Sequence, residues 1–514
     1  MRILRQAPAL VTSVAILGCG SAEVVDDHDG PLPPDAARVC INADPSQAGP
    51  DDTCGVFVSS TFGSDDNSGT LEHPVRSLGA AFALALRGAR RVYACAEVFE
   101  EQAEIPAGVE LWGGLDCADG WMYVGATKKT TIAPGEAGVI PLRLLPGDGV
   151  ARAIDVRAEA ADGVQPSESS IAAIVLPGAR VEILRSELAA GDGAPGVDGE
   201  QGGGSGALLT AEDGATGLPG ADACGGDVVP GGASVVTECD GVESFGGKGG
   251  DGHMAYGTAG EHGQPMPASP DGIHGEGGGG QNGSHAQCAA GHVGHAGQDG
   301  EHGLGAAGMG RLTLAGWEGE RGQDGGNGRP GQGGGGGGAS RGPLYYECGA
   351  GQPQAGASGG SGGSGGCGGK GGKGGGYGGA SIGLISLSDD VTVRATIITT
   401  GDGGDGGRGG LWQGGGQGGQ GALGGVGVGS SVGACGGGRG GQGGNGGHGG
   451  GGLGGVTLGI VHVVEQPVTM EGVMIDTGRP GKGGLGGSPH VTLPGTTGED
   501  GLDASVQSFP APAH

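Results

Sequence analysis

Short apolar runs alternate with glycine-rich stretches along the chain, and three of the runs share a pattern. Each has apolar residues ten, eight and three positions before a glycine: Val181, Ile183 and Leu188 before Gly191; Val391, Val393 and Ile398 before Gly401; Val468, Met470 and Ile475 before Gly478. Apolar residues two apart are typical of a strand with one buried face. A further apolar run precedes each unit, at 171–176, 382–387 and 456–461. Each unit therefore predicts strand, turn, strand, turn, strand, which is one coil of a solenoid.

The spacing of the three units predicts how the glycine tracts are attached. Gly191 and Gly401 are 210 positions apart, and Gly401 and Gly478 are 77 apart. Ordinary repeats are a few tens of residues long. If the units stack as neighbouring coils, the glycine tracts are insertions at one equivalent turn and leave the stack on one side. The alternative is that apolar segments in a glycine-rich chain align by chance.

The segment 56–117 has the order of elements found at the start of one class of solenoid. A strand at 56–58 precedes a GSDDNSGT loop at 63–70, an Ala-rich helix over 77–85 with Ser77 as its cap, and strands at 91–95 and 109–114. This order resembles the N-terminal cap of right-handed parallel β-helix proteins of the pectin-lyase-like class. The resemblance implies an all-β fold: a parallel β-helix solenoid with long glycine-rich inserts and one short capping helix. Such a cap covers the open end of the first coil.

The glycine tracts have a period of three residues. Gly accounts for 136 of 514 residues, and the tracts at 359–379, 401–410 and 436–455 repeat Gly-Gly-X. Three residues per turn is the geometry of polyproline II, whereas the 28 Pro are too few for collagen. We expect glycine-rich helices that bundle and hydrogen-bond to one another, with the X side chains facing water. Flexible coil is the alternative. In composition the tracts resemble the PGRS repeats of mycobacterial-type surface proteins, but that family's head domain is absent.

The N-terminus has the features of an export signal. A positively charged start is followed by an apolar run at 7–17 that is too short to span a bilayer. The run ends in Leu17-Gly18-Cys19, which resembles the lipobox of bacterial lipoproteins. The resemblance implies acylation of Cys19 and a membrane anchor, and Gly20 favours the outer membrane. The alternative is an ordinary cleaved signal peptide that is followed by a cysteine.

The cysteine count also favours export. Eleven Cys minus Cys19 leave ten, an even number as disulfides require. Proximity along the chain predicts the pairs Cys40–Cys54, Cys95–Cys117, Cys224–Cys239, Cys288–Cys348 and Cys367–Cys435. No Cys/His spacing typical of zinc is present.

These patterns divide the chain into a series of segments. We predict a lipoprotein signal peptide at 1–18, an acidic tether at 19–53, the cap and first coils at 54–190, a glycine-rich insert at 191–379, a coil at 380–400, a second insert at 401–454, a coil at 455–477 and a glycine-rich tail at 478–514.

Charge and composition exclude some partners and offer few metal ligands. A net charge of −30 argues against nucleic acid and anionic lipid surfaces as partners. Seven of the 13 His lie between 253 and 302, where they suit zinc, copper or nickel, but we favour the alternative of a polar loop with no fixed ligand geometry. The stretch 246–251 resembles the start of a calcium-binding β-roll repeat but does not recur. We expect no cofactor beyond calcium bound loosely by scattered Asp.

Catalytic candidates are sparse. Asp155, Asp389, Asp402 and Asp476 fall on different predicted coils, and the four Trp suit core packing as well as sugar stacking. No catalytic motif for a nucleophile, a metalloprotease or a phosphate-binding loop occurs. We therefore expect a non-enzymatic, lipid-anchored surface protein with a structural or adhesive role. Its partners would be the membrane, through the anchor, and extracellular polysaccharide or surface proteins, without nucleic acid. The alternative is a β-helix protein that binds or cleaves polysaccharide.

Overall fold

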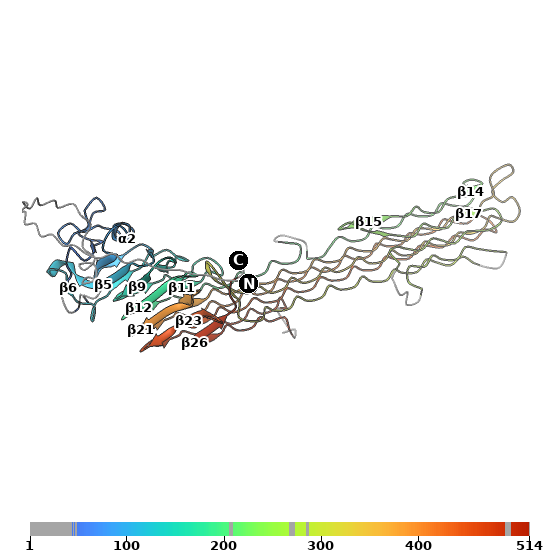
Figure 1. Cartoon of the computed structure of the whole chain (residues 1–514). Helices are drawn as coiled ribbons and strands as arrows, with labels where there is room; N and C mark the ends of the chain where they lie inside the picture. Colours follow the sequence, from blue (N-terminus) through green and yellow to red (C-terminus); the bar gives the residue numbers. More distant parts are fainter. Residues whose placement is uncertain are drawn as a thin grey trace, which may run out of the picture. The chain divides into compact units, whose positions relative to one another are not determined.

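Nearly all the regular structure is β-strand, accompanied by a single α-helix in the part of the chain described here, Leu78–Ala85 (α2) (Figure 1). The computed structural model describes residues 44, 46, 49–204, 209–266, 273–283, 287–488 and 495–512. The predicted signal peptide and most of the predicted tether, with Cys19 and Cys40, lie outside these residues. No helix among the described residues is long and apolar enough to cross a membrane.

Three parallel sheets contain most of the strands. Sheet 1 consists, in spatial order, of β1 (Val56–Val58), β2 (Arg91–Cys95), β5 (Glu110–Asp116), β9 (Val150–Ile154), β12 (Arg180–Leu184), β21 (Asp390–Arg394) and β24 (Thr469–Glu471), with β6 (Met122–Tyr123) antiparallel to β5. Sheet 2 consists of β3 (Val98–Phe99), β7 (Thr130–Ile132), β10 (Val156–Glu159), β13 (Glu187–Ala189), β22 (Ile397–Thr399) and β25 (Met474–Asp476). Sheet 3 consists of β4 (Ala103–Ile105), β8 (Leu142–Leu144), β11 (Ser170–Val175), β20 (Ser381–Ser386), β23 (Thr457–Val463) and β26 (Asp503–Phe509).

Three short antiparallel pairs lie within the glycine-rich part of the chain. They are β14 (Val228–Val229) with β17 (Gly252–His253), β15 (Val236–Cys239) with β16 (Val242–Phe245), and β18 (Arg311–Thr313) with β19 (Gly316–Glu318). A 3-10 turn, Cys117–Asp119, follows β5.

The structure confirms the alignment of the three apolar units. In sheet 1, Ile183 pairs with Val393, which pairs in turn with Met470. Sheet 2 has the same order, because Leu188 pairs with Ile398 and Ile398 with Ile475. The runs that precede the units pair in sheet 3 through Ile171, Ile382 and Leu458. Segments 210 and 77 residues apart are therefore neighbouring strands.

Side-chain alternation explains the core between the sheets. In β12 and β21 every second residue is buried, and the inward residues Val181, Ile183, Val391 and Val393 belong to one apolar cluster. Strands β11 and β20 are buried along their whole length, because a second apolar cluster that includes Trp317 covers the other face of sheet 3. Parallel strands covered on both faces have continuous apolar sequences.

The helix predicted over 77–85 is confirmed as α2. Its first turn is capped by Ser77, whose hydroxyl accepts a hydrogen bond from the Ala80 amide at 3.1 Å. The buried side chains of α2 include Leu78 and Phe82, which pack in the main core cluster.

The glycine-rich segments leave the sheets at one position in three successive repeats. They follow β13, β22 and β25, and they return to β20, β23 and β26, which are neighbours in sheet 3. We call these segments the glycine bundle: 191–204, 209–266, 273–283, 287–380, 400–456, 477–488 and 495–502. Figure 1 shows them running side by side.

Hydrogen bonds between the segments of the glycine bundle recur every three residues. The amides of Gly325, Gly328 and Gly331 donate to the carbonyls of Gly372, Gly369 and Gly366 at 2.8–2.9 Å. Three residues per repeat is the period of polyproline II, which has no internal hydrogen bonds and must find partners in neighbouring chains. Glycine is required at these contacts, because a Cβ on Gly365 would overlap the carbonyl of Gly331.

The prediction that the X side chains face water is wrong for the segment 354–369. Ser361 and Ser364 are fully buried, and their hydroxyls accept the amides of Leu218 and Ala215 at 2.8 and 2.7 Å. This segment is enclosed by its neighbours, so its third edge points at another backbone instead of at solvent. On outer segments, X residues such as Asp405 and Arg408 are exposed as predicted.

The disulfides correct three of the predicted pairs. Cys95–Cys117 is confirmed, but the others are Cys224–Cys348, Cys239–Cys367 and Cys288–Cys435. The predicted pairs Cys224–Cys239, Cys288–Cys348 and Cys367–Cys435 are therefore wrong. Chain proximity failed because the glycine bundle brings together residues 124 to 147 positions apart. Cys54 is also disulfide-bonded, and Cys40, its predicted partner, lies outside the described residues.

Candidate functional site

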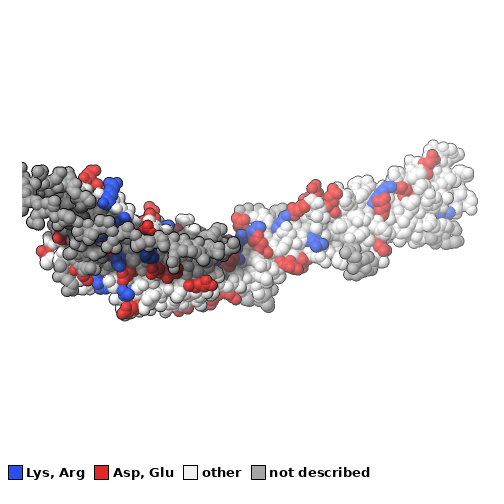
Figure 2. Space-filling view, in the orientation of Figure 1, with Lys and Arg blue, Asp and Glu red and all other residues white. Residues whose placement is uncertain are grey.

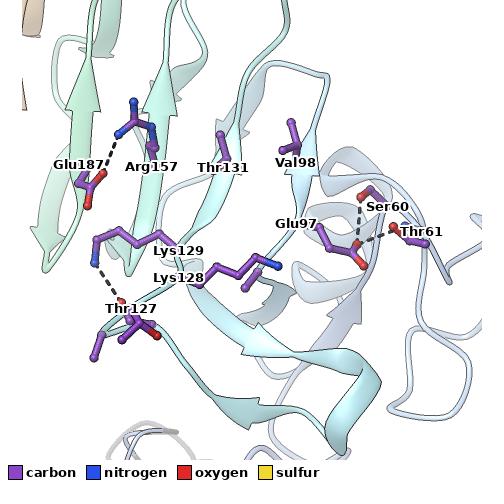
Figure 3. Close-up of a pocket in the computed structure, with 13 residues that line it drawn as sticks. Ser60, Thr61, Glu97, Val98, Thr127, Lys128, Lys129, Thr131, Arg157 and Glu187 are labelled. Carbon is purple, nitrogen blue, oxygen red and sulfur yellow. Dashed lines mark hydrogen bonds and ion pairs between the residues drawn. The ribbon is translucent and has the colours of Figure 1, made fainter.

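A polar pocket of about 620 Å³ lies beside sheet 2 (Figure 3). Strands β7, β10 and β13 contribute Thr131, Arg157 and Glu187 to its wall, and strand β3 with the loops at 60–61, 96–97 and 125–129 completes it. The polar lining residues are Ser60, Thr61, Glu97, Thr127, Lys128, Lys129, Thr131, Arg157 and Glu187. The sequence gives no local motif for this pocket, because its residues come from strands in successive repeats.

Both carboxylates of the pocket already have partners. One oxygen of Glu97 accepts from the hydroxyls of Ser59 and Ser60 and from the Thr61 amide, at 3.0–3.2 Å. Glu187 accepts from Arg157 at 2.8 Å. The pKa of Arg157 is raised by its hydrogen bond to Glu159 and also by Glu187, so the guanidinium stays charged.

The two lysines differ in their contacts. Lys129 donates to the Gly125 carbonyl at 3.2 Å and lies 3.8 Å from the carboxylate of Asp155. Lys128 is exposed and extends into the pocket in Figure 3, and its ammonium group has no hydrogen-bond or ion-pair partner within the described chain. The pocket therefore offers a free ammonium group and several hydroxyls, which suits recognition of a polar or anionic group. Among the described lining residues, the carboxylates are those of Glu97 and Glu187, and both are hydrogen-bonded.

A ladder of alternating charges crosses the outer face of sheet 1. Consecutive ion pairs at 2.6–3.3 Å join Arg91, Glu110, Arg152, Glu182, Arg394 and Glu471. Trp112 lies beside this row, with the guanidinium groups of Arg91 and Arg185 at 5.3 and 5.8 Å from its ring. A groove of unpaired Asp and Arg would favour a polysaccharide-processing enzyme, whereas these charges neutralise one another.

The four candidate catalytic Asp residues are not brought together. Asp155 is 1% exposed at the corner between β9 and β10, where it accepts from Arg185 at 2.6 Å. Asp402 lies in the glycine bundle and pairs with Arg479 at 2.7 Å. Asp389 lies between β20 and β21, and Asp476 ends β25. Asp155 and Asp402 therefore have structural partners.

The histidines of the 253–302 region are spread along the glycine bundle, and only His274 and His295 contact each other among the described rings, with centroids 5.3 Å apart. His253 stacks on Tyr256 at 4.6 Å, whereas His302 stacks on His448 at 5.3 Å. The described ranges contain no group of three His, Cys, Asp or Glu side chains that could hold a metal ion. Asp251, the acidic residue of the calcium-like stretch, binds Lys248 at 2.8 Å and accepts the Gly231 amide at 2.7 Å. Three of the Trp, at 112, 121 and 317, are buried, and Trp317 packs in an apolar core cluster.

Sequence reasoning missed a repeated role of Asp in the glycine bundle. Asp192 accepts the amide of Asp402 at 2.7 Å, and Asp402 accepts the amide of Arg479 at 2.8 Å. Asp500 accepts the Gly483 amide at 2.9 Å. Each carboxylate thus accepts a hydrogen bond from an outward-pointing backbone amide of the neighbouring segment. The aligned Gly-Asp pairs at 191–192 and 401–402 are the signal that could have revealed it.

These bonds predict a loss of stability in acid. The hydrogen bonds of Arg479 lower the pKa of Asp402, and Lys482 together with the Gly483 amide lowers that of Asp500. A carboxyl with a depressed folded pKa stabilises the fold above its unfolded pKa of about 4, and this contribution is lost as the pH falls through the folded pKa. We expect the thermal midpoint to fall between pH 5 and pH 2.5, measured by circular dichroism. Asp402→Asn with Asp500→Asn keeps the acceptors but does not titrate, so its midpoint should fall less. An equal fall in both proteins would contradict this role.

Comparison with known proteins gives little further information. A scan against protein-family models found no match, and a search of curated proteins found none in sequence. Among solved structures, the chain has a likeness to the GH136 lacto-N-biosidase from Eubacterium ramulus (a selenomethionine derivative), with 15% identity and a TM-score of 0.14. The alignment covers 26% of each chain, so this protein spans about a quarter of that structure.

Proposed function

We propose that this chain is a non-enzymatic, lipid-anchored protein of the cell surface, in which a parallel β-helix carries the glycine bundle as a structural and adhesive element. The observation that carries this proposal is the glycine bundle itself. Its inner segments are fully enclosed, and backbone-to-backbone hydrogen bonds recur along them every third residue. A bundle that is enclosed and hydrogen-bonded in this way keeps one fixed structure, which suits a structural role outside the cell.

The order of the strands supports the β-helix. Along the chain, β7, β8 and β9 lie in sheets 2, 3 and 1, and β10, β11 and β12 repeat that order. The cycle continues through β13, β20 and β21 and through β22, β23 and β24. A chain that visits three parallel sheets in turn winds as a solenoid, and here the glycine-rich insertions interrupt one of its corners.

Charge and disulfides support a location outside the cytoplasm. The net charge of −30 keeps such a protein soluble and separate from its copies. Four disulfides join described residues, and disulfides persist in oxidising compartments. The anchor itself rests on the lipobox-like sequence that ends at Cys19.

Labelling with a fatty-acid analogue tests the anchor. In a bacterial host that processes lipoproteins, the wild-type protein should incorporate the label and sediment with membranes, because several acyl chains anchor stably. Cys19→Ser should abolish both, while Cys54→Ser, which removes a disulfide cysteine, should keep the label. A labelled Cys19→Ser protein, or an unlabelled wild type, would contradict the proposal.

The alternative function is binding of a polysaccharide beside the β-strands. The pocket around Lys128 favours it, because a free ammonium and several hydroxyls can bind a sugar that carries a carboxylate. Lys128→Ala should then abolish binding of acidic oligosaccharides, measured by calorimetry with oligogalacturonate as the probe. Unchanged binding, or no binding by the wild type, would remove this alternative.

A further inference from the structure

Two loops of the glycine bundle expose aromatic and aliphatic side chains to solvent. We call residues 342–349 and 423–432 the tip loops, since they connect long segments where these turn back toward the strands. Tyr345 and Tyr346 are 79% and 70% exposed, and Leu423 and Val426 are 81% and 67% exposed. Contiguous exposed apolar surface on a soluble protein commonly marks an interaction site.

The tip loops are fixed to one another and to the glycine bundle. The carboxylate of Glu347 accepts from the amide and the hydroxyl of Ser430, both at 2.6 Å. The Ser430 hydroxyl lies 2.8 Å from the Leu344 amide, from which it accepts. The disulfide Cys224–Cys348 ties the first loop to a neighbouring segment. A ligand would thus meet side chains on a constrained loop, which lowers the entropy lost on binding.

The placement of the tyrosines is selective. Aromatic residues make up 3% of the chain, and of its six Tyr the exposed ones are Tyr256, Tyr345 and Tyr346. Tyr256 belongs to the same end of the glycine bundle, because His253, on which it stacks, pairs with Arg341 just before the first tip loop. Tyr346 also has a positive φ of 59°, a left-handed conformation that residues with a side chain rarely adopt. Backbone strain at an exposed aromatic residue is typical of binding sites.

The charge of the tip loops limits the chemistry of the ligand. Residues 342–346 and 423–432 contain no Asp, Glu, Lys or Arg, although the chain carries a net charge of −30. The face drawn in Figure 2 is likewise mostly uncharged at that end of the glycine bundle. An anion would find no Lys or Arg in the tip loops, and the carboxylates that a cation would meet there, Glu347 and Asp222, already accept hydrogen bonds from Ser430 and from the Val426 amide. An uncharged ligand fits best.

The small number of exposed tyrosines indicates which kind of uncharged ligand fits the tip loops. A tyrosine has an apolar ring face and a polar hydroxyl, which match the C–H face and the hydroxyls of a sugar ring. A stable protein partner needs about 800 Å² on each side, whereas two adjacent tyrosines match one or two sugar rings. We propose that the tip loops bind an uncharged oligosaccharide through Tyr345 and Tyr346. This assigns a ligand class to the adhesive role and rests on the proposed function.

The test uses the full exported chain and defined probes. Neutral oligosaccharides on a glycan array, followed by calorimetry with the best binder, should detect binding by the wild type. Tyr345→Ala and Tyr346→Ala should each weaken it roughly three- to tenfold, and together about thirtyfold or more, since aromatic contacts contribute about 0.5–1.5 kcal/mol each. Tyr345→Phe with Tyr346→Phe keeps the ring faces and should retain most of the affinity. All variants should keep the wild-type thermal midpoint, because these side chains are exposed.

Other variants separate the possible outcomes. Lys128→Ala should not affect binding; if it abolishes binding and the tyrosine variants do not, the site is the polar pocket. Absence of binding to every neutral oligosaccharide would overturn the proposal. Dimerisation of the wild type through the tip loops would also overturn the proposal. Sedimentation would reveal it if the wild type is a dimer and the double Ala variant is a monomer. Failure of acylation at Cys19 would contradict the anchor and leave this assay unchanged.

Discussion

Gly365→Ala is expected to disrupt the glycine bundle, whereas Gly279→Ala should leave it intact. The Cβ added at Gly365 would overlap the backbone carbonyl of Gly331, and the Gly365 amide is held at 2.8 Å by the hydroxyl of Ser244. Backbone cannot swing aside as a flexible side chain does, so neighbouring segments would have to separate. We expect a destabilisation of about 3 kcal/mol. The measurements are urea unfolding and hydrogen exchange of the glycine amides.

Gly279 provides a matched control within the same bundle. A Cβ there meets no atom within 4 Å, and the residue does not have the positive φ that favours glycine. Because alanine restricts the unfolded chain more than glycine does, Gly279→Ala should stabilise the protein by about 0.4–1 kcal/mol. The two substitutions thus have opposite expected signs. Equal effects would mean that the close packing of glycine does not hold the segments together.

Val393→Asp is expected to unfold the parallel sheets. Val393 is fully buried in the main core cluster, paired between Ile183 and Met470. A carboxyl group there would find no hydrogen-bond partner in the apolar interior. Its burial would therefore cost free energy whether it is protonated or ionised. We expect a loss of about 4 kcal/mol or more, measured by urea unfolding followed through circular dichroism.

Thr392→Asp is the control, because the neighbouring residue of the same strand points away from the core. Thr392 is half-buried and pairs with Glu182, so the new carboxylate would face a like charge. Like charges opposite one another in a sheet cost about 0.2–1 kcal/mol. If Thr392→Asp were as damaging as Val393→Asp, the assignment of inward and outward residues in β21 would be wrong.

Local patterns sufficed for the pairing of distant strands. The apolar residues of each unit recur at the same distances from a glycine, and a strand register is set by which side chains must be buried together. Ile183, Val393 and Met470 therefore aligned correctly although long insertions separate them. The period of three in the glycine tracts likewise indicated segments that need partners, because a polyproline II helix cannot satisfy its own backbone.

The relative placement of the glycine segments could not be predicted. Every Gly-Gly-X segment fits every other, so nothing local distinguishes an enclosed segment from an outer one. The buried hydroxyls of Ser361 and Ser364 and the pair Cys239–Cys367 depend on that placement. The pocket at Lys128 and the exposed Tyr345 were missed for the same reason, since both sites arise where distant segments meet.

In the glycine bundle, the position of a residue within the three-residue repeat decides whether it can carry a side chain. Ser358, Ser361, Ser364 and Cys367 occupy every third position of one segment, and the glycines between them face carbonyls that leave no room for a side chain. Insertion of one or two residues would move these side chains into the glycine positions from that point onward. Insertion of a whole triplet keeps every side chain at its own position in the repeat. The returning segment then needs an added triplet as well, so that the two segments remain equally long and their hydrogen bonds stay aligned. Variation in the length of such a bundle should therefore occur in matched multiples of three, so that the bundle evolves in discrete steps.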